Sequence, residues 1–239
     1  MTQPVGTEAP ARGAGRNLNL TDLADRYGSD KGSRKHRYTE LYHMLFHPYR
    51  QRKITFLEMG LLIGGPEQGM DKDRETADLP SIRMWLEYFP KAQIHGLDVS
   101  DFSWFSHERF SFHRCDMDDR AEIARVAAAM PSPDIVIDDA SHASHHQQNA
   151  FLEIFPKLAP GGLYVIEDLR WQPESYEQEG ITKTAALLRS FIDDRRFSHA
   201  DSAIAAAFDA LIPQISACIV HPVRYQKQRR DQVAVIHKR

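Results

Sequence analysis

Short runs of apolar residues alternate with longer amphipathic segments along most of the chain. Seven of the short runs are typical of strands: "KITFLEMG", "QIHGLDVS", "FSFHRCDM", "PDIVIDD", "GLYVIEDLR", "SACIVHPVRYQ" and "QVAVIHKR". Segments with apolar residues at helical spacing lie between them, among them "IRMWLEYFP", "RAEIARVAAAM" and "HHQQNAFLEIFPKLAP". Such alternation is typical of a doubly wound α/β sheet, in which most strands are parallel and buried on both faces.

The two ends of this pattern differ from its middle. Two helices are predicted ahead of the first strand, one from Thr21 as N-cap to about Gly28 and one in "RYTELYHMLFHPYR". The last two strands are separated by the basic segment Lys227–Arg230, which fits the turn of an antiparallel hairpin. We therefore expect an α/β, Rossmann-like, doubly wound sheet of seven mostly parallel strands, with N-terminal helices and a C-terminal antiparallel hairpin.

Length and local composition predict how the chain divides. The 239 residues suit one globular domain. The segment "MTQPVGTEAPARGAGR" is rich in glycine, proline and alanine and lacks the apolar stretch of a secretory signal. We expect a flexible arm at residues 1–16 and one domain at residues 17–239, with helices in 17–52 and the Rossmann-like core in 53–239.

Charge and cysteine content argue against several classes of protein. The formal net charge of −3 gives no support for a nucleic-acid or membrane surface. No run of about 18 apolar residues occurs, so we expect no membrane-spanning helix. Cys115 and Cys218 form no CxxC pair, which argues against a disulfide framework or a zinc ribbon and favours the cytoplasm.

Acidic residues stand at the ends of four predicted strands. They are Glu58, Asp98, the pair Asp138 and Asp139, and the pair Glu167 and Asp168. Ligands of open α/β sheets bind outside the carboxyl ends of the strands. Any one acid could simply cap the next helix. Four strands that end in acids are better explained by a ligand with several hydroxyl and amino groups.

The turn after the first strand, "LEMGLLIGG", contains a glycine where a ligand could approach the backbone closely. Gly60 allows that approach, but Leu62 stands where a second glycine would complete a dinucleotide fingerprint. A long charged segment at 65–79 follows and reads as a functional or mobile loop. Asp98, at the end of the second strand, could hold both hydroxyls of a ribose.

Several of these motifs resemble one enzyme family. "LEMG" and "GLDVSD" resemble motifs I and II of the class I S-adenosylmethionine-dependent methyltransferases. "LADRYGSDKG", "SIRMWLEYFPKAQIHGLDVSD", "DIVIDDASH" and "FPKLAPGGLYVIEDL" together resemble the metal-dependent sugar O-methyltransferases of macrolide and related pathways, of the mycinamicin and spinosyn type. This resemblance covers nearly the whole chain after residue 17.

The resemblance implies roles for individual residues. It implies that Asp139, Glu167 and Asp168 hold a metal ion and that His142 is the catalytic base. It also implies a set of cofactor-binding residues, namely Glu58, Gly60, Asp98, Asp116, Met117 and Asp139.

The residues in this region could form either of two kinds of metal site. His142, His145 and His146 have the i, i+3 and i, i+4 spacing of one helical face, as a zinc site could. No cysteine lies nearby, and three carboxylates make a hard oxygen site. We therefore expect Mg²⁺, with Mn²⁺ or Ca²⁺ as possible substitutes.

The function expected from the resemblance is methyl transfer from S-adenosylmethionine to a sugar hydroxyl of a glycosylated natural product or nucleotide sugar. Trp171 and Tyr176 could wall the acceptor pocket. One alternative is an O-methyltransferase for a catechol-like acceptor. Another is a relative of hydroxylase/methoxylase components, without methyl transfer of its own. We expect a cytoplasmic homo-oligomer with a small-molecule substrate and no nucleic-acid or membrane partner.

Overall fold

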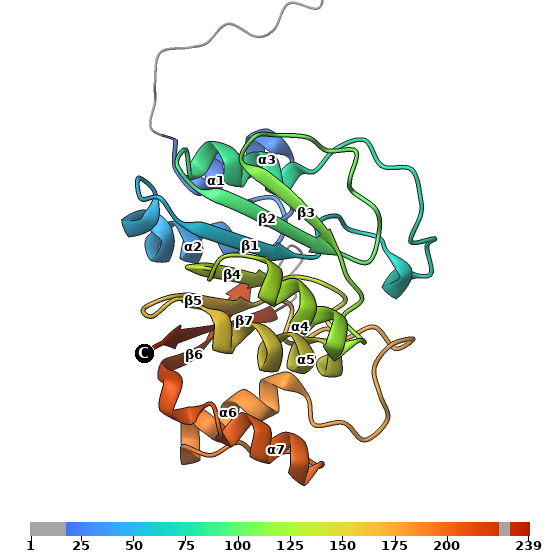
Figure 1. The fold of residues 1–239 in the computed structure, drawn as a ribbon, viewed down its shortest axis with the longest axis vertical. Helices are drawn as coiled ribbons and strands as arrows, with labels where there is room; N and C mark the ends of the chain where they lie inside the picture. Colours follow the sequence, from blue (N-terminus) through green and yellow to red (C-terminus); the bar gives the residue numbers. More distant parts are fainter. Residues whose placement is uncertain (1–17, 225–229) are drawn as a thin grey trace, which may run out of the picture.

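A twisted sheet of seven strands runs through the computed structural model, which describes residues 18–224 and 230–239 (Figure 1). Its strands are β1 (Thr55–Met59), β2 (Gln93–Asp98), β3 (Phe110–Arg114), β4 (Ile135–Asp138), β5 (Leu163–Ile166), β6 (Ile215–Arg224) and β7 (Arg230–Lys238). The predicted arm at 1–16 lies outside the described residues, as does the predicted turn at 227–230 except for Arg230.

The strand order is β3-β2-β1-β4-β5-β7-β6. The first five strands pair in parallel, while β7 is antiparallel to both β5 and β6. The predicted fold class is thereby confirmed. The order reverses at β1 and β4, which places a crevice at their carboxyl ends.

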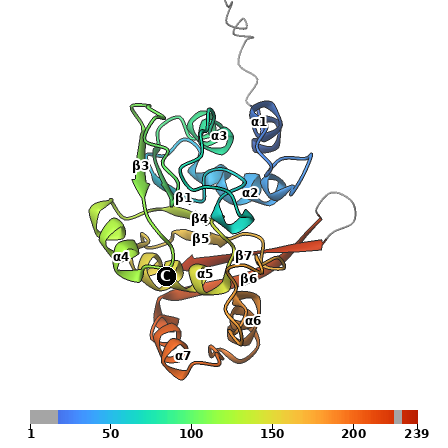
Figure 2. The same cartoon turned by 90° about the vertical axis from the view of Figure 1, so that its right-hand side faces the viewer.

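Helices cover both faces of the sheet (Figure 2). One face carries α1 (Leu20–Tyr27), α2 (Tyr38–Phe46) and α3 (Pro80–Tyr88), and the other carries α4 (Arg120–Ala129), α5 (Ser144–Ile154), α6 (Thr184–Asp194) and α7 (Ser202–Asp209). Successive strand residues alternate between the two cores: Phe56 packs with the first group and Leu57 with the second. None of the helices in this part of the chain is both long and apolar enough to cross a bilayer.

The first helix begins earlier than the sequence predicts. Its N-cap is Asn19, whose Oδ1 accepts a hydrogen bond from the backbone N–H of Asp22 at 2.8 Å. Thr21 therefore lies inside the helix, and its hydroxyl is 3.0 Å from the hydroxyl of Thr39 instead. The predicted end is confirmed, since Gly28 closes the helix at φ 76°.

The long charged segment at 65–79 contains a short 3₁₀ turn, Pro66–Gln68, and otherwise irregular backbone. Arg74 fastens it to the sheet edge by donating hydrogen bonds to the hydroxyl of Ser100 at 3.2 Å and to the carbonyl of Leu62 at 3.3 Å. The segment therefore borders the carboxyl ends of β1 and β2.

The buried His95 and its half-buried neighbour His113 should make the stability of this fold depend on pH. His95 Nδ1 lies 3.0 Å from His113 Nε2, and burial together with His113 lowers the pKa of His95 from 6.5 to about 4. The unfolded chain binds the proton more readily, so stability is lost as pH falls through 6.5 towards 4. We expect the free energy of unfolding to fall by about 2 kcal/mol from pH 7 to pH 5 through His95 alone. Urea unfolding of His95→Gln should show a smaller decline than wild type, and equal declines would contradict this prediction.

Candidate active site

A cleft of about 2000 Å³ opens at the carboxyl ends of the parallel strands. Seven of the predicted site residues line it: Gly60, Asp98, Asp116, Met117, Asp139, His142 and Asp168. The other two, Glu58 and Glu167, are buried, and both form ion pairs with Lys31, which also lines the cleft. The fold thus brings all the predicted residues to one edge of the sheet.

The backbone at Gly60 passes unusually close to the end of β4. Gly60 has φ 79°, and a Cβ atom there would stand 2.0 Å from the carbonyl oxygen of Asp139. Only glycine allows both the backbone conformation and the approach. This contact sets the turn after β1 against the predicted metal ligand.

Replacing Gly60 by alanine should therefore disturb the site as well as the fold. Gly161 offers a matched control, because it has φ 76° but no atom within 4 Å of a built Cβ. Gly161→Ala should lose about 1 kcal/mol of stability through backbone strain alone. Gly60→Ala should lose more than twice that amount and bind the methyl donor expected from the sequence at least ~10-fold more weakly. Denaturation and calorimetry check both variants, and equal behaviour of the two would refute the close-approach argument.

Two backbone N–H groups hold the carboxylate of Asp98 in place. Its Oδ2 accepts from the N–H of Leu61 and its Oδ1 from the N–H of Ser100, both at 2.8 Å. These hydrogen bonds fix the carboxylate of Asp98 beside the turn that follows β1.

The other two predicted cofactor residues, Asp116 and Met117, follow β3. Asp116 is exposed and lines the cleft, whereas Met117 is buried and its carbonyl accepts a hydrogen bond from the side chain of Asn149 at 3.2 Å.

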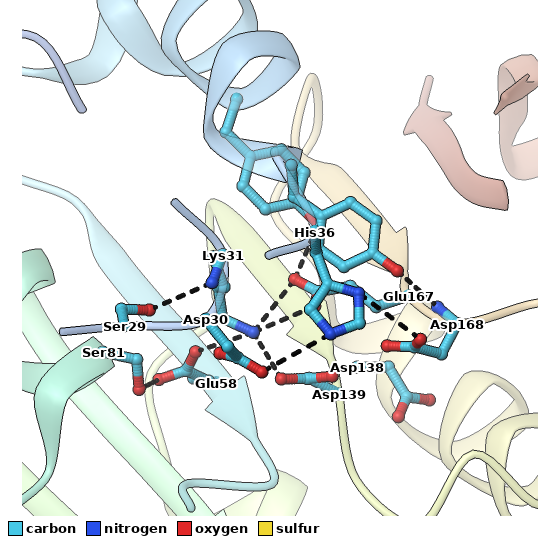
Figure 3. A network of polar contacts seen from close by, with 12 residues as sticks. Ser29, Asp30, Lys31, His36, Glu58, Ser81, Asp138, Asp139, Glu167 and Asp168 are labelled. Carbon is cyan, nitrogen blue, oxygen red and sulfur yellow. Dashed lines mark hydrogen bonds and ion pairs between the residues drawn. The ribbon is translucent and has the colours of Figure 1, made fainter. Parts of the chain in front are cut away.

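A buried lysine joins the acids of different strands (Figure 3). Lys31 Nζ pairs with Asp139 Oδ2, lies 2.9 Å from Glu167 Oε2 and lies 3.6 Å from Glu58 Oε1. Tyr42 donates to Glu167 Oε1 at 2.7 Å. Lys31 therefore links the end of β1 to the ends of β4 and β5.

Among the described residues, three groups of side chains could hold a metal ion: Asp118 with His145 and His146, His36 with Asp168 and Asp231, and a third group. The third group unites Asp139, His142 and Asp168. One donor atom from each lies within 4.8 Å of the others. His142 and Asp168 both have positive φ values, 63° and 51°, which are rare for residues other than glycine and concentrate at functional sites. His142 Nδ1 is buried, and no hydrogen-bond partner is recorded for it among the described residues.

Several buried carboxyl groups in this region have pKa values that differ from their ordinary ones. Burial raises the pKa of Glu58 to about 7 and the pKa values of Glu167 and Asp168 well above their ordinary range, with nearby Asp139 as a further cause at Glu167 and Asp168. Burial opposes ionisation of Asp139 too, but Lys31 and His142 keep its pKa below the usual value.

The same carboxyl groups also contact one another. The carboxyl groups of Glu167 and Asp139 interact closely enough to shift the pKa of Asp139, and those of Asp168 and Asp231 closely enough to raise the pKa of Asp168. The ammonium of Lys31 supplies one positive charge between Asp139 and Glu167, whereas Asp168 and Asp231 still need a proton or a further cation near them. The residues present therefore fit a divalent cation held by oxygen donors.

Comparisons with known proteins identify homologous enzymes. The chain is 37% identical over 199 residues to mycinamicin VI 2''-O-methyltransferase of Micromonospora griseorubida, a match that covers 79% of this chain and 47% of that protein. It is 41% identical over 157 residues to 8-demethyl-8-alpha-L-rhamnosyl tetracenomycin-C 2'-O-methyltransferase of Streptomyces olivaceus, which covers 65% of this chain and 39% of that protein. No protein-family model matches the chain.

A solved structure shows the same relationship. The MycE methyltransferase of the mycinamycin pathway, in complex with Mg, SAH and mycinamycin VI, superposes with a TM-score of 0.70 at 31% identity. The match covers 93% of this chain and 55% of that one. The chain is a homologue of the sugar O-methyltransferases of natural-product pathways. It spans about half the length of the relatives it matches.

In this sugar O-methyltransferase homologue, the three histidines of the "SHASHH" segment do not share a helical face. The spacing argument was wrong for His142, because α5 begins only at Ser144 and His142 precedes it in a left-handed conformation. His145 and His146 face Asp118 instead, with their Nε2 atoms 3.4 and 3.6 Å from its Oδ1. His142 stands apart from them, beside the acids.

Two aromatic residues flank the open side of the homologue's cleft. The ring of Trp171 lies 5.3 Å from that of His142, edge to face, and Trp171 is 41% exposed. The ring of Tyr176 lies 5.7 Å from that of His146. Both aromatic residues line the cleft, Trp171 beside His142 and Tyr176 beside His146.

Sequence reasoning missed several residues that contact the acids. No sequence pattern indicated the contacts of Lys31 or of Asp231, which follows a basic segment. Tyr38, whose hydroxyl lies 3.2 Å from the backbone N of Asp168, and Tyr42 share a face of α2. Their i, i+4 spacing predicts a shared face, but not that it points at the strand ends.

Proposed function

We propose that the chain is an S-adenosylmethionine- and Mg²⁺-dependent O-methyltransferase for a sugar hydroxyl of a glycosylated natural product or nucleotide-activated sugar. The observation that carries this proposal is the group formed by Asp139, His142 and Asp168, with donor atoms within 4.8 Å of one another at the carboxyl ends of the strands. Residues 17–239 would form the catalytic domain. The names of the relatives support the choice of a sugar hydroxyl.

The methyl donor would lie over the ends of β1 and β2. The carboxylate of Asp98 would accept hydrogen bonds from the ribose hydroxyls, and the turn at Gly60 would let the methionine part approach the backbone. Glu58, Asp116, Met117 and Asp139 complete the proposed donor site. Its support is the shared cleft, in which the turn at Gly60 and Asp98 stand beside Asp139.

The acceptor would bind next to the acids. Asp139, Glu167 and Asp168 would hold Mg²⁺, which lowers the pKa of a nearby hydroxyl when bound. His142 would take the acceptor proton, because its ring reaches the same space and burial keeps its pKa below the ordinary value. Both substrates would then lie side by side, which would favour in-line attack of the acceptor oxygen on the methyl group.

A labelled-donor assay tests this function. Purified protein would receive S-adenosylmethionine with a labelled methyl group, Mg²⁺ and separate panels of glycosides, nucleotide sugars and catechols. We expect label in a glycoside or nucleotide sugar. Label in catechols alone would overturn the acceptor class, and absence of donor binding by calorimetry would overturn methyl transfer altogether.

Two further predictions concern the whole protein. We propose that it acts in the cytoplasm and assembles as a homo-oligomer, with no nucleic-acid or membrane partner. Light scattering after gel filtration checks the assembly directly, and a monomer at micromolar concentration would contradict it.

A further inference from the structure

Lys31 is a buried lysine in a loop, surrounded by acids from three strand ends. Its side chain is 1% exposed, and it lies in the connection between α1 and α2. Burying an ammonium group is costly unless it is paired and hydrogen-bonded. The three ion pairs supply that compensation and keep the pKa of Lys31 well above its ordinary value, although burial alone would lower it.

The backbone of Lys31 is anchored independently of its side chain. Its carbonyl accepts from the backbone N–H of Thr39 at 3.1 Å and from the Thr39 hydroxyl at 3.0 Å. Thr39 is itself fully buried in α2. The loop therefore holds the lysine in place from the α2 side while the ammonium points into the acids (Figure 3).

The ammonium group of Lys31 donates hydrogen bonds to particular carboxylate oxygens. It binds Oδ2 of Asp139, and it lies 3.1 and 2.9 Å from the two oxygens of Glu167. Tyr42 holds Glu167 Oε1 from the other side. One ammonium group thus holds two carboxylates from different strands in orientation, and donor atoms of His142 and Asp168 lie within 4.8 Å of a donor atom of Asp139.

We propose that Lys31 is a positioning residue that fixes the carboxylates of Asp139 and Glu167 and so makes the cation site select Mg²⁺ over Ca²⁺. Mg²⁺ demands a small, near-octahedral arrangement of oxygens, whereas Ca²⁺ accepts a larger and more flexible one. A rigid pair of carboxylates favours the first ion. This inference rests on the proposed divalent-cation site.

The test compares dissociation constants for Mg²⁺ and Ca²⁺ by calorimetry, in wild type and in Lys31→Met. Both ions carry the same charge and displace the same protons, so the ratio of the two constants cancels the lost charge of the lysine. A lysine that only stabilises the fold would leave the ratio unchanged. We expect Lys31→Met to shift the ratio at least ~10-fold towards Ca²⁺.

Two more variants complete the experiment. Tyr42→Phe removes the second donor to Glu167 without changing charge, so it should shift the ratio in the same direction even if Lys31→Met does not fold. Lys183→Met is the control, because Lys183 is exposed and pairs with Glu177 at 3.3 Å, and its ratio should match wild type. An unchanged ratio in the Lys31 and Tyr42 variants would overturn this inference alone. No binding of either ion to wild type would overturn the metal-dependent function instead.

Discussion

Replacing His142 by alanine is expected to lower turnover at least ~100-fold while leaving the affinity for S-adenosylhomocysteine nearly unchanged. The imidazole of His142 has a donor atom within 4.8 Å of donor atoms of Asp139 and Asp168, and burial lowers its pKa. Its loss removes a proton acceptor but no group placed on the donor. Initial rates and calorimetry on the same preparation check the two halves of the prediction.

His145 supplies the matched control for this experiment. It lies three residues further along, but its ring faces Asp118 and not the acids at the strand ends. His145→Ala should keep most of the wild-type rate. Near wild-type turnover in His142→Ala, or an equal loss in both variants, would remove His142 from the role of base.

Asp168→Asn is expected to weaken Mg²⁺ binding by more than ~100-fold, because loss of a direct ligand should exceed the ~10- to 100-fold cost of losing its supporting partners. Asparagine has the same shape and tolerates the left-handed backbone that Asp168 adopts at φ 51°. Folding and donor binding should therefore survive. Calorimetric titration with Mg²⁺ measures the loss.

Asp138→Asn is the control for that variant. Asp138 is buried at the end of β4, where burial raises its pKa to about 7, and it is absent from the group formed by Asp139, His142 and Asp168. Its replacement should leave Mg²⁺ affinity largely intact. If Asp138→Asn were as damaging as Asp168→Asn, the ligand assignment would have to change.

The fold and the strand-end acids were predictable for a physical reason. Parallel strands buried on both faces read as continuous apolar runs, as at Ile135–Ile137, and their carboxyl ends meet at one edge. Acids that follow such runs must therefore converge, and Asp98, Asp139 and Asp168 do line one cleft.

Other features depend on contacts that no local pattern encodes. Lys31 is 108 residues from Asp139 and 136 from Glu167 along the chain, so its role follows only from the packing of α1 and α2 on the sheet. The N-cap is Asn19 and not the predicted Thr21, and both residue types can cap a helix, with asparagine preferred. His142 was assigned helical spacing although the helix starts after it.

The central claim is that a divalent cation at the strand ends is required for methyl transfer. The most direct measurement is the rate of label transfer from S-adenosylmethionine to an accepted glycoside, in Mg²⁺ and then in excess EDTA. The account predicts that EDTA reduces transfer to background and that added Mg²⁺ restores it. Full transfer in EDTA would contradict the account.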